Sequence, residues 1–246
     1  MNFQEQLSEN IVENVSENGF TIIEDMFSQN EIKNILQEID IYSKNNSKNN
    51  DLFAVRCFLL EIPTLKNILL NEKITSLLSV FGENYKIVKA IYFDKPKTAN
   101  WLVNWHQDLT ISVKEKFEIE GFSKWLPKEN YKESYFSVQP TQKYLDNLLT
   151  IRIHLDDCTK ENGALRVLPK THKTIQNSKD FPTDYLVKFS QNEQICEVKK
   201  GGILVMKPLI LHSSKRTENS LKRRVIHLEF SNLQLPKPLI WAELSN

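Results

Sequence analysis

Residues 201–214 read GGILVMKPLILHSS, and this stretch decides the fold class. Two short apolar runs, at 203–207 and 209–213, lie on either side of Pro208, a residue that cannot donate to a β ladder. Short apolar runs bounded by glycine and proline are typical of buried strands. The second run contains His212, a polar side chain at the end of an apolar strand. The stretch therefore predicts two consecutive strands and one candidate functional histidine.

Further runs of the same character surround this stretch. They cover residues 86–94, 100–106, 148–155, 164–168, 194–199 and 222–230, with Pro96, Asn162-Gly163 and Pro169 among the breaks between them. Their number and order predict a mainly β fold with flanking helices, a double-stranded β-helix of the jelly-roll, cupin-like kind. We expect this core to occupy residues 85–230 of a single domain over residues 1–246.

The first 84 residues have helical rather than strand periodicity. Apolar side chains at Phe3, Leu7, Ile11 and Val15 form one stripe, which predicts a helix over 3–17. A short strand at 19–23 follows, then a helix from the capping box of Ser28 and Glu31 to about Tyr42, and helical patterns at 63–81 that end near Gly82. We therefore expect residues 1–84 to form a mainly helical flank.

Composition excludes several classes of protein. The 246 residues carry 32 basic and 31 acidic side chains, so no global field favours nucleic acid or an anionic membrane as partner. No stretch approaches the roughly 20 apolar residues that span a bilayer. The acidic first twenty residues do not resemble a secretory signal, and three scattered cysteines are typical of reduced thiols. We expect a cytoplasmic protein.

A histidine and a carboxylate share one face of the expected strand that ends in Trp105-His106-Gln107-Asp108. Side chains two residues apart point the same way in a strand, so His106 and Asp108 can bind one ion. Two imidazoles and one carboxylate on one side of a metal leave the opposite positions open, which is the ligand set of non-haem iron(II) oxygenases. With His212 as the third ligand, these residues form the candidate metal triad.

A second His-x-Asp, His154-Leu155-Asp156, competes for the same role. In a double-stranded β-helix the His-x-Asp ends the second core strand, and the last histidine opens the seventh. Four predicted strands separate Asp108 from the strand of His212, as this order requires, whereas only three separate Asp156 from it. Asp156 also leads into a turn, where carboxylates commonly cap backbone N–H groups. The strand count therefore favours His106 and Asp108.

Residues 114–137 interrupt the strand pattern with many aromatic and charged side chains. An insert of this length is usually a lid or binding loop, and the alternative is a helical excursion packed on the barrel. Its ends lie near the expected metal, where a closing cover is useful to an oxygenase. If it closes, Trp125, Tyr131 or Tyr135 should contact the substrate.

Several ordered motifs make the chain resemble the phytanoyl-CoA dioxygenase family of Fe(II)- and 2-oxoglutarate-dependent oxygenases. The matching stretches are Asp94-Lys95-Pro96, Trp105-His106-Gln107-Asp108, LDDCTKENGALRVLP (155–169), KPLILHSS (207–214) and RRVIHLEF (223–230). One departure is Lys170, which occupies a turn position where the family usually has glycine. The adjoining His172 is expected to be a structural residue at the surface.

The resemblance implies iron(II) at the candidate metal triad, with O₂ and 2-oxoglutarate as co-substrates. It places 2-oxoglutarate on Arg223 with Ser214 nearby, and Thr150 joins this set from the polar face of strand 148–155. Arginine is suited to this role because its guanidinium binds a carboxylate in a bidentate manner. Arg224 is the alternative, since it shares the apolar face of the last strand. Helices over the outer face of the sheet would instead turn Arg223 inward.

Candidate substrate contacts follow from the same faces. Arg152 lies on the polar face of strand 148–155, and Asn104 shares the face of His106. Gln139 lies just after the insert, directly before Pro140, and Arg56 lies upstream of the core. Several cations near one mouth would suit a small organic substrate that carries a carboxylate or phosphate.

Two classes of function remain. By resemblance, the chain is a dioxygenase that oxidises a small organic, possibly anionic, substrate with release of succinate and CO₂, hydroxylation being the default outcome. The alternative is a cupin-like metal protein, an isomerase or a small-molecule binding module, which keeps the histidine ligands but needs no Arg223.

Overall fold

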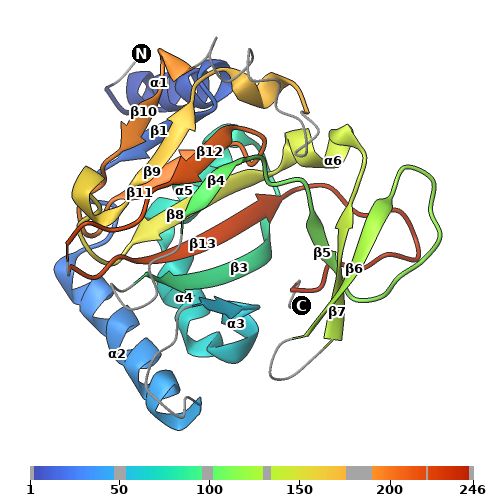
Figure 1. Cartoon of the computed structure of the whole chain (residues 1–246), viewed down its shortest axis with the longest axis horizontal. Helices are drawn as coiled ribbons and strands as arrows, with labels where there is room; N and C mark the ends of the chain where they lie inside the picture. The colour runs from blue at the N-terminus through green and yellow to red at the C-terminus, as the bar shows by residue number, and fades with distance from the viewer. Residues whose placement is uncertain are drawn as a thin grey trace.

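Two antiparallel sheets face each other around the candidate site, and a third, smaller sheet closes one side (Figure 1). The computed structural model describes residues 3–46, 54–95, 102–129, 134–175, 190–219 and 221–243. The elements in chain order are α1 (Phe3–Glu17), β1 (Phe20–Ile23), α2 (Gln29–Asn46), β2 (Ala54–Arg56), α3 (Phe58–Glu61), η1 (Pro63–Leu65), α4 (Lys66–Leu69), α5 (Glu72–Phe81), β3 (Lys86–Asp94), β4 (Val103–His106), β5 (Ile111–Val113), β6 (Ser123–Glu129), β7 (Ser134–Gln139), α6 (Gln142–Asn147), β8 (Leu149–His154), η3 (Lys160–Asn162), β9 (Leu165–Leu168), η4 (Thr171–Lys173), β10 (Gln194–Cys196), β11 (Ile203–Met206), β12 (Leu211–Ser214) and β13 (Arg224–Ser231).

The sheet order is that of a double-stranded β-helix. The large sheet runs β1-β11-β8-β13-β3-β2, and the opposing sheet runs β10-β9-β12-β4. Each of the eight core strands that the sequence predicts is present, with ends shifted by at most a few residues. The two strands of the deciding stretch are β11 and β12, and they enter different sheets on either side of Pro208. The predicted fold class is confirmed.

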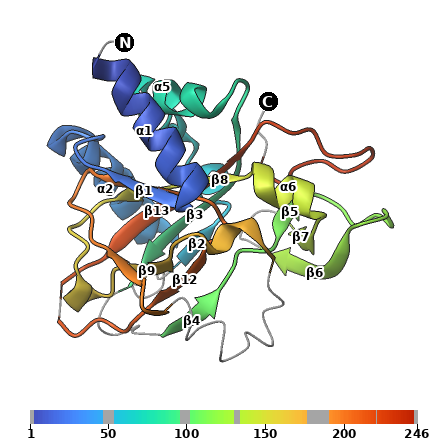
Figure 2. The ribbon, with the colours of Figure 1, turned by 90° about the horizontal axis from the view of Figure 1, so that it is seen from above.

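Helices cover the outer face of the large sheet. Figure 2 shows α1, α2 and α5 on one side of β13 and β3, with β9, β12 and β4 on the other. The main core lies between helices and sheet, where Ile32 and Ile35 of α2 are buried in one cluster with Ile226, Leu228 and Phe230 of β13. The apolar residues of β13 therefore face outward toward the helices, and the alternate residues face the interior of the barrel.

The N-terminal flank forms as its sequence predicts. Ser28 and Glu31 make the expected capping box, because the Ser28 amide donates to Glu31 Oε2 at 2.8 Å and the Glu31 amide donates to Ser28 Oγ at 3.2 Å. The helical pattern at 63–81 divides into three short helices, and the Asn71 side chain caps the last of them by accepting from the Ile74 amide.

Lys170 adopts a left-handed backbone conformation with φ of 68°, as expected of a glycine position. The adjoining His172 is buried at 8% exposure, and its Nε2–H donates to the Ser16 carbonyl at 2.9 Å. It is a structural residue that ties the turn to α1, although it is buried rather than at the surface.

The insert at 114–137 is neither structureless nor helical in its described part. Strands β6 and β7 pair as an antiparallel hairpin, and β7 pairs with β5, which gives a three-stranded sheet, here called the hairpin sheet. A segment after β13 fastens this sheet to the barrel, since the Ala242 amide donates to the Ser112 carbonyl at 3.0 Å. Residues 130–133, which include Tyr131, lie outside the described residues.

None of the helices in the described ranges combines the length and the apolar character that crossing a bilayer requires.

Candidate metal and co-substrate site

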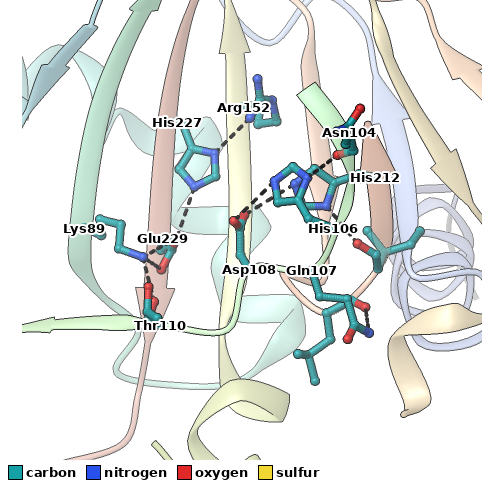
Figure 3. A network of polar contacts seen from close by, with 12 residues as sticks. Lys89, Asn104, His106, Gln107, Asp108, Thr110, Arg152, His212, His227 and Glu229 are labelled. Atoms are coloured by element: carbon teal, nitrogen blue, oxygen red, sulfur yellow. Dashed lines mark hydrogen bonds and ion pairs between the residues drawn. The ribbon is translucent and has the colours of Figure 1, made fainter. Parts of the chain in front are cut away.

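Strands β4 and β12 bring the candidate metal triad together. They pair antiparallel with His106 directly opposite His212, and the two imidazole centroids are 4.1 Å apart. Asp108 follows β4, and its amide donates to the Pro208 carbonyl at 3.0 Å, which holds it next to the start of β12. One ligand atom from each of the three residues lies within 4.8 Å of the others. Figure 3 shows both imidazoles pointing toward the Asp108 carboxylate.

Backbone carbonyls fix the tautomer of both imidazoles. His106 Nδ1 lies 2.8 Å from the Asn104 carbonyl, and His212 Nδ1 lies 2.8 Å from the Ile210 carbonyl. A carbonyl oxygen can only accept, so each Nδ1 carries a proton, and in the neutral ring Nε2 then presents a lone pair. The Nε2 atoms lie 3.8 Å (His106) and 3.6 Å (His212) from the Asp108 oxygens. This hydrogen bonding from the far ring nitrogen is typical of metal-binding histidines.

The electrostatics of the triad favour the forms that bind a metal. Burial alone would raise the pKa of Asp108, but the imidazoles of His212, His227 and His106 outweigh it and hold that pKa well below its usual range. Burial lowers the pKa of His212 to about 4, which keeps its imidazole neutral at pH 7. A carboxylate and two imidazoles on one side of an open cavity fit a divalent iron.

The rival pair does not converge with His212. His154 is 2% exposed, with its pKa lowered well below the ordinary value by burial and by the charge of Arg152. Asp156 accepts from Arg224 at 2.7 and 2.8 Å, and Asp157 Oδ1 accepts from the Lys200 amide at 2.8 Å. The Asp156–Asp157 segment is therefore a structural turn, as the strand count indicates.

A cavity of about 480 Å³ opens beside the triad. Arg223 lines it together with Val225, His227 and Glu229, so the polar face of the last strand points inward. Arg223 Nη1 donates to the Gly163 carbonyl at 2.6 Å, and its guanidinium also contacts the Cys158 thiol. Arg224, in contrast, is paired with Asp156 and is not part of the lining.

Only one of the two other residues expected near the co-substrate lines the cavity. Ser214 lines the cavity, whereas Thr150 is fully buried and does not. The sequence reasoning missed Lys95, whose Nζ lies 3.4 Å from Ser214 Oγ and 2.8 Å from the Lys215 carbonyl. Burial and the nearby charge of Arg223 lower the pKa of Lys95 to about 8. Its place in the Asp94-Lys95-Pro96 motif was the available signal.

Two of the four candidate substrate contacts line the cavity. Arg152 and Arg56 line the cavity, whereas Asn104 and Gln139 do not. Asn104 is exposed because a β-bulge shifts the β4–β12 register: His106 is opposite His212, but Ser214 is opposite Val103. Two residues that both face the cavity are thus three apart in β4, and strict alternation fails.

The two described aromatic residues that were expected to contact the substrate lie on different faces of the hairpin sheet. Tyr135 is buried and lines the cavity. Trp125 points to the other face of the hairpin sheet, where it packs edge-on against Phe136 with ring centroids 6.3 Å apart. Trp125 therefore does not line the cavity, and the side chains of β6 that do so are Leu126 and Lys128.

A polar network beside the triad was not expected from the sequence. Arg152 Nη1 lies 3.0 Å from His227 Nδ1, and because arginine can only donate, this nitrogen accepts. His227 Nε2 then carries the proton and donates to Glu229 at 3.2 Å. Lys89 Nζ binds both Glu229 oxygens at 2.8 and 2.9 Å and the Thr110 carbonyl at 2.8 Å. Figure 3 shows this chain extending away from Asp108.

Comparison with known structures agrees with the fold. The epimerase SnoN of nogalamycin biosynthesis, a non-haem α-ketoglutarate-dependent enzyme, superposes with a TM-score of 0.70 at 13% identity over 93% of this chain and 82% of that one. EctD from S. alaskensis with bound Fe superposes with a TM-score of 0.67 at 13% identity over 94% and 76% of the two chains. At this level of identity, the likeness shows the fold alone.

Sequence comparison goes further. A probable alpha-ketoglutarate-dependent hypophosphite dioxygenase from Stutzerimonas stutzeri is 27% identical over 174 residues, which covers 63% of this chain. The chain spans 50% of the length of that relative. Residues 15–225 match the phytanoyl-CoA dioxygenase (PhyH) family, and this range includes the metal triad, Ser214 and Arg223. The chain therefore belongs to the phytanoyl-CoA dioxygenase family of iron- and 2-oxoglutarate-dependent oxygenases.

Proposed function

We propose that this protein is an Fe(II)- and 2-oxoglutarate-dependent dioxygenase that oxidises a small molecule. The observation that carries the proposal is the position of Arg223. Its guanidinium and a site with two imidazoles and one carboxylate line one cavity. A cupin-like metal protein would need the ligands but not a buried, fixed cation beside them.

We propose the following roles for the residues. His106, Asp108 and His212 hold iron(II), which when bound supplies the activation of O₂ coupled to oxidation of 2-oxoglutarate to succinate and CO₂. Arg223 and Ser214, two buried side chains that line the cavity, hold the distal carboxylate of 2-oxoglutarate.

Secondary contacts support these groups. The Gly163 carbonyl holds the Arg223 guanidinium in one orientation, and Lys95 adds a second positive charge behind Ser214. A buried carboxylate needs such charged hydrogen bonds to compensate for its lost hydration. Hydroxylation of an unactivated C–H bond is the default reaction, and the substrate occupies the part of the cavity beyond the metal.

Anaerobic titration of the purified protein with Fe(II) and then 2-oxoglutarate tests the proposal. We expect the charge-transfer absorption of an iron-chelated 2-oxo acid, followed by slow succinate release when air is admitted. Iron binding without a spectral response to 2-oxoglutarate would instead support the cupin-like alternative.

A further inference from the structure

The cavity continues past the metal triad to an end that the co-substrate does not need. This hairpin end is walled by β2 and β3 of the large sheet and by the hairpin sheet. Arg56, Lys128, Tyr135 and Glu243 line it, each from a different segment of the chain. Residues from four segments that meet around one space can select what enters it.

Most cations of the cavity already have a partner. Lys89 is paired with Glu229 at 2.8 Å. Arg152 binds the imidazole of His227, and its guanidinium carbon lies 5.9 Å from the centre of the Phe93 ring. These two cations therefore belong to the scaffold of the site.

Two cations at the hairpin end are different. Within the described ranges, neither Arg56 nor Lys128 forms an ion pair. Both lie next to Tyr135. Lys128 is the cross-strand partner of Tyr135 in the β6–β7 hairpin. Cys57, which follows Arg56 in the chain, forms a side-chain hydrogen bond with the Tyr135 hydroxyl. The positive charge of Arg56 also acts on that hydroxyl, although burial raises the pKa of Tyr135 to about 12. The exposed Arg56 and the half-buried Lys128 thus line the same cavity from two different sheets.

The carboxylates nearby do not balance these charges. Glu229 is compensated by Lys89. Glu243 is 6% exposed and accepts from the Ala90 amide at 2.9 Å, and burial raises its pKa to about 8, so its protonated form predominates at pH 7. The described side chains that line the hairpin end therefore carry an excess of positive charge in a partly enclosed space, where a charge interaction is less screened than in water.

We propose that Arg56 and Lys128 form the seat for an oxyanion group of the substrate, a carboxylate or a phosphonate, while the remainder of the molecule extends toward the metal triad. The inference rests on the proposed function, since it assigns the substrate class of that site. It replaces Arg152 as the main substrate cation, because Arg152 is held by His227. The small oxyanion in the name of the Stutzerimonas stutzeri relative is compatible with this class.

Calorimetric titration of the anaerobic protein loaded with Fe(II) and 2-oxoglutarate tests the seat. The probes are propionate, methylphosphonate and the uncharged propionamide. We expect one or both anions to bind and propionamide not to, with the better anion naming the oxyanion. Arg56→Ala and Lys128→Ala should each weaken anion binding about tenfold or more, and added salt should weaken it in the wild type.

A matched control removes the same charge elsewhere. Lys143→Ala, on the exposed surface of α6, should leave anion binding unchanged. Equal binding of propionamide and propionate by the wild type, or unchanged anion binding in both Arg56→Ala and Lys128→Ala, would overturn the proposal. The charge-transfer absorption with 2-oxoglutarate separates the two hypotheses, because its absence in the wild type counts against the dioxygenase itself, whereas its presence with no anion preference counts only against the seat.

Discussion

His106 and His212 are register partners across the antiparallel pair β4–β12, and each donates its Nδ1 proton to the carbonyl two residues before it. Both Nε2 atoms are therefore directed to one point next to Asp108 before any metal arrives. Such preorganisation reduces the conformational entropy that metal binding must overcome.

Removal of either imidazole should abolish the metal site. His106→Ala should lose Fe(II) binding and 2-oxoglutarate turnover, because the two remaining ligands do not suffice to hold the ion. His154→Ala is the control, since this imidazole is buried away from the triad, and it should retain iron at the cost of some stability. Metal content after dialysis measures both variants. A metal-free His154→Ala beside a metal-loaded His106→Ala would reverse the assignment.

Replacement of Arg223 should weaken the binding of 2-oxoglutarate. Arg223→Ala should reduce 2-oxoglutarate affinity by about 2–4 kcal/mol, because a buried carboxylate loses charged hydrogen bonds, while iron affinity changes little. Arg224→Ala breaks the pair with Asp156 instead, so it should lower the melting temperature and keep 2-oxoglutarate affinity. Titration of the charge-transfer absorption in both variants checks the pair, and the opposite ranking would move the role to Arg224.

Substitution of Gly163 should affect the binding of 2-oxoglutarate indirectly, through Arg223. Its φ is +80°, and a Cβ there would lie 2.7 Å from the Lys215 carbonyl oxygen. Gly163→Ala should therefore lose about 1–3 kcal/mol of stability and displace the carbonyl that orients Arg223, which raises the KM for 2-oxoglutarate. Gly121→Ala, with φ of +81° and a clash with Thr141, is the matched control. Gly121→Ala should lose stability without a change in the KM for 2-oxoglutarate. An unchanged KM in Gly163→Ala as well would contradict the role of Gly163 in positioning Arg223.

Glu243 should make stability depend on pH. Its pKa is raised by burial to about 8 in the folded state, above the ordinary 4.5, so the folded state binds more protons than the unfolded state between these values. The stability contribution is present below pH 4.5 and is lost as pH rises through 8. Glu243→Gln keeps an acceptor for the Ala90 amide and removes the titration. At pH 8.5 it should exceed the wild type by more than about 1 kcal/mol, and the gain should shrink toward pH 5. Urea unfolding at several pH values measures this, and a gain independent of pH would exclude the titration as its cause.

We propose that the hairpin sheet closes over the substrate. Most side chains of β6 are at least partly exposed, and this strand is at the edge of a small sheet, so its amides should exchange faster than those of β8 and β13 in the absence of ligand. Protection should increase when 2-oxoglutarate and an anionic probe are bound. Hydrogen exchange followed by mass spectrometry resolves these segments, and equal protection of β6 and β13 without ligand would make the hairpin sheet a fixed wall.

The sequence predicts the barrel well because its strands are short apolar runs with proline and glycine at their ends. The three residues that it selects as the candidate metal triad lie together in the structure, because alternation and strand order are both simple rules. It fails in the insert, where β6 contains Pro127 and mixes aromatic with charged residues, so that neither period dominates. The pairing with β7 and the fastening through Ala242 come from long-range contacts that no local pattern records.

Two differences between the expected and the observed cavity depend on strand register. Asn104 was expected in the cavity by alternation, but one bulge at Val103 changes the face. The network of Lys89, His227 and Glu229 could not be predicted, because it joins side chains on two strands and its value depends on exact register. Only the polar face of β13, read as an inward face, signalled that such partners exist.

The division of β13 into an outward apolar face and an inward polar face bears on how such enzymes could diversify. Ile226, Leu228 and Phe230 anchor the strand to the helical layer, while the residues between them contact whatever occupies the barrel. Substitutions at the inward positions can change chemistry or selectivity without opening a void in the layer that maintains the fold. Stability and specificity are thus encoded on alternate residues of one strand, so a directed-evolution library confined to inward positions should retain a high fraction of folded variants.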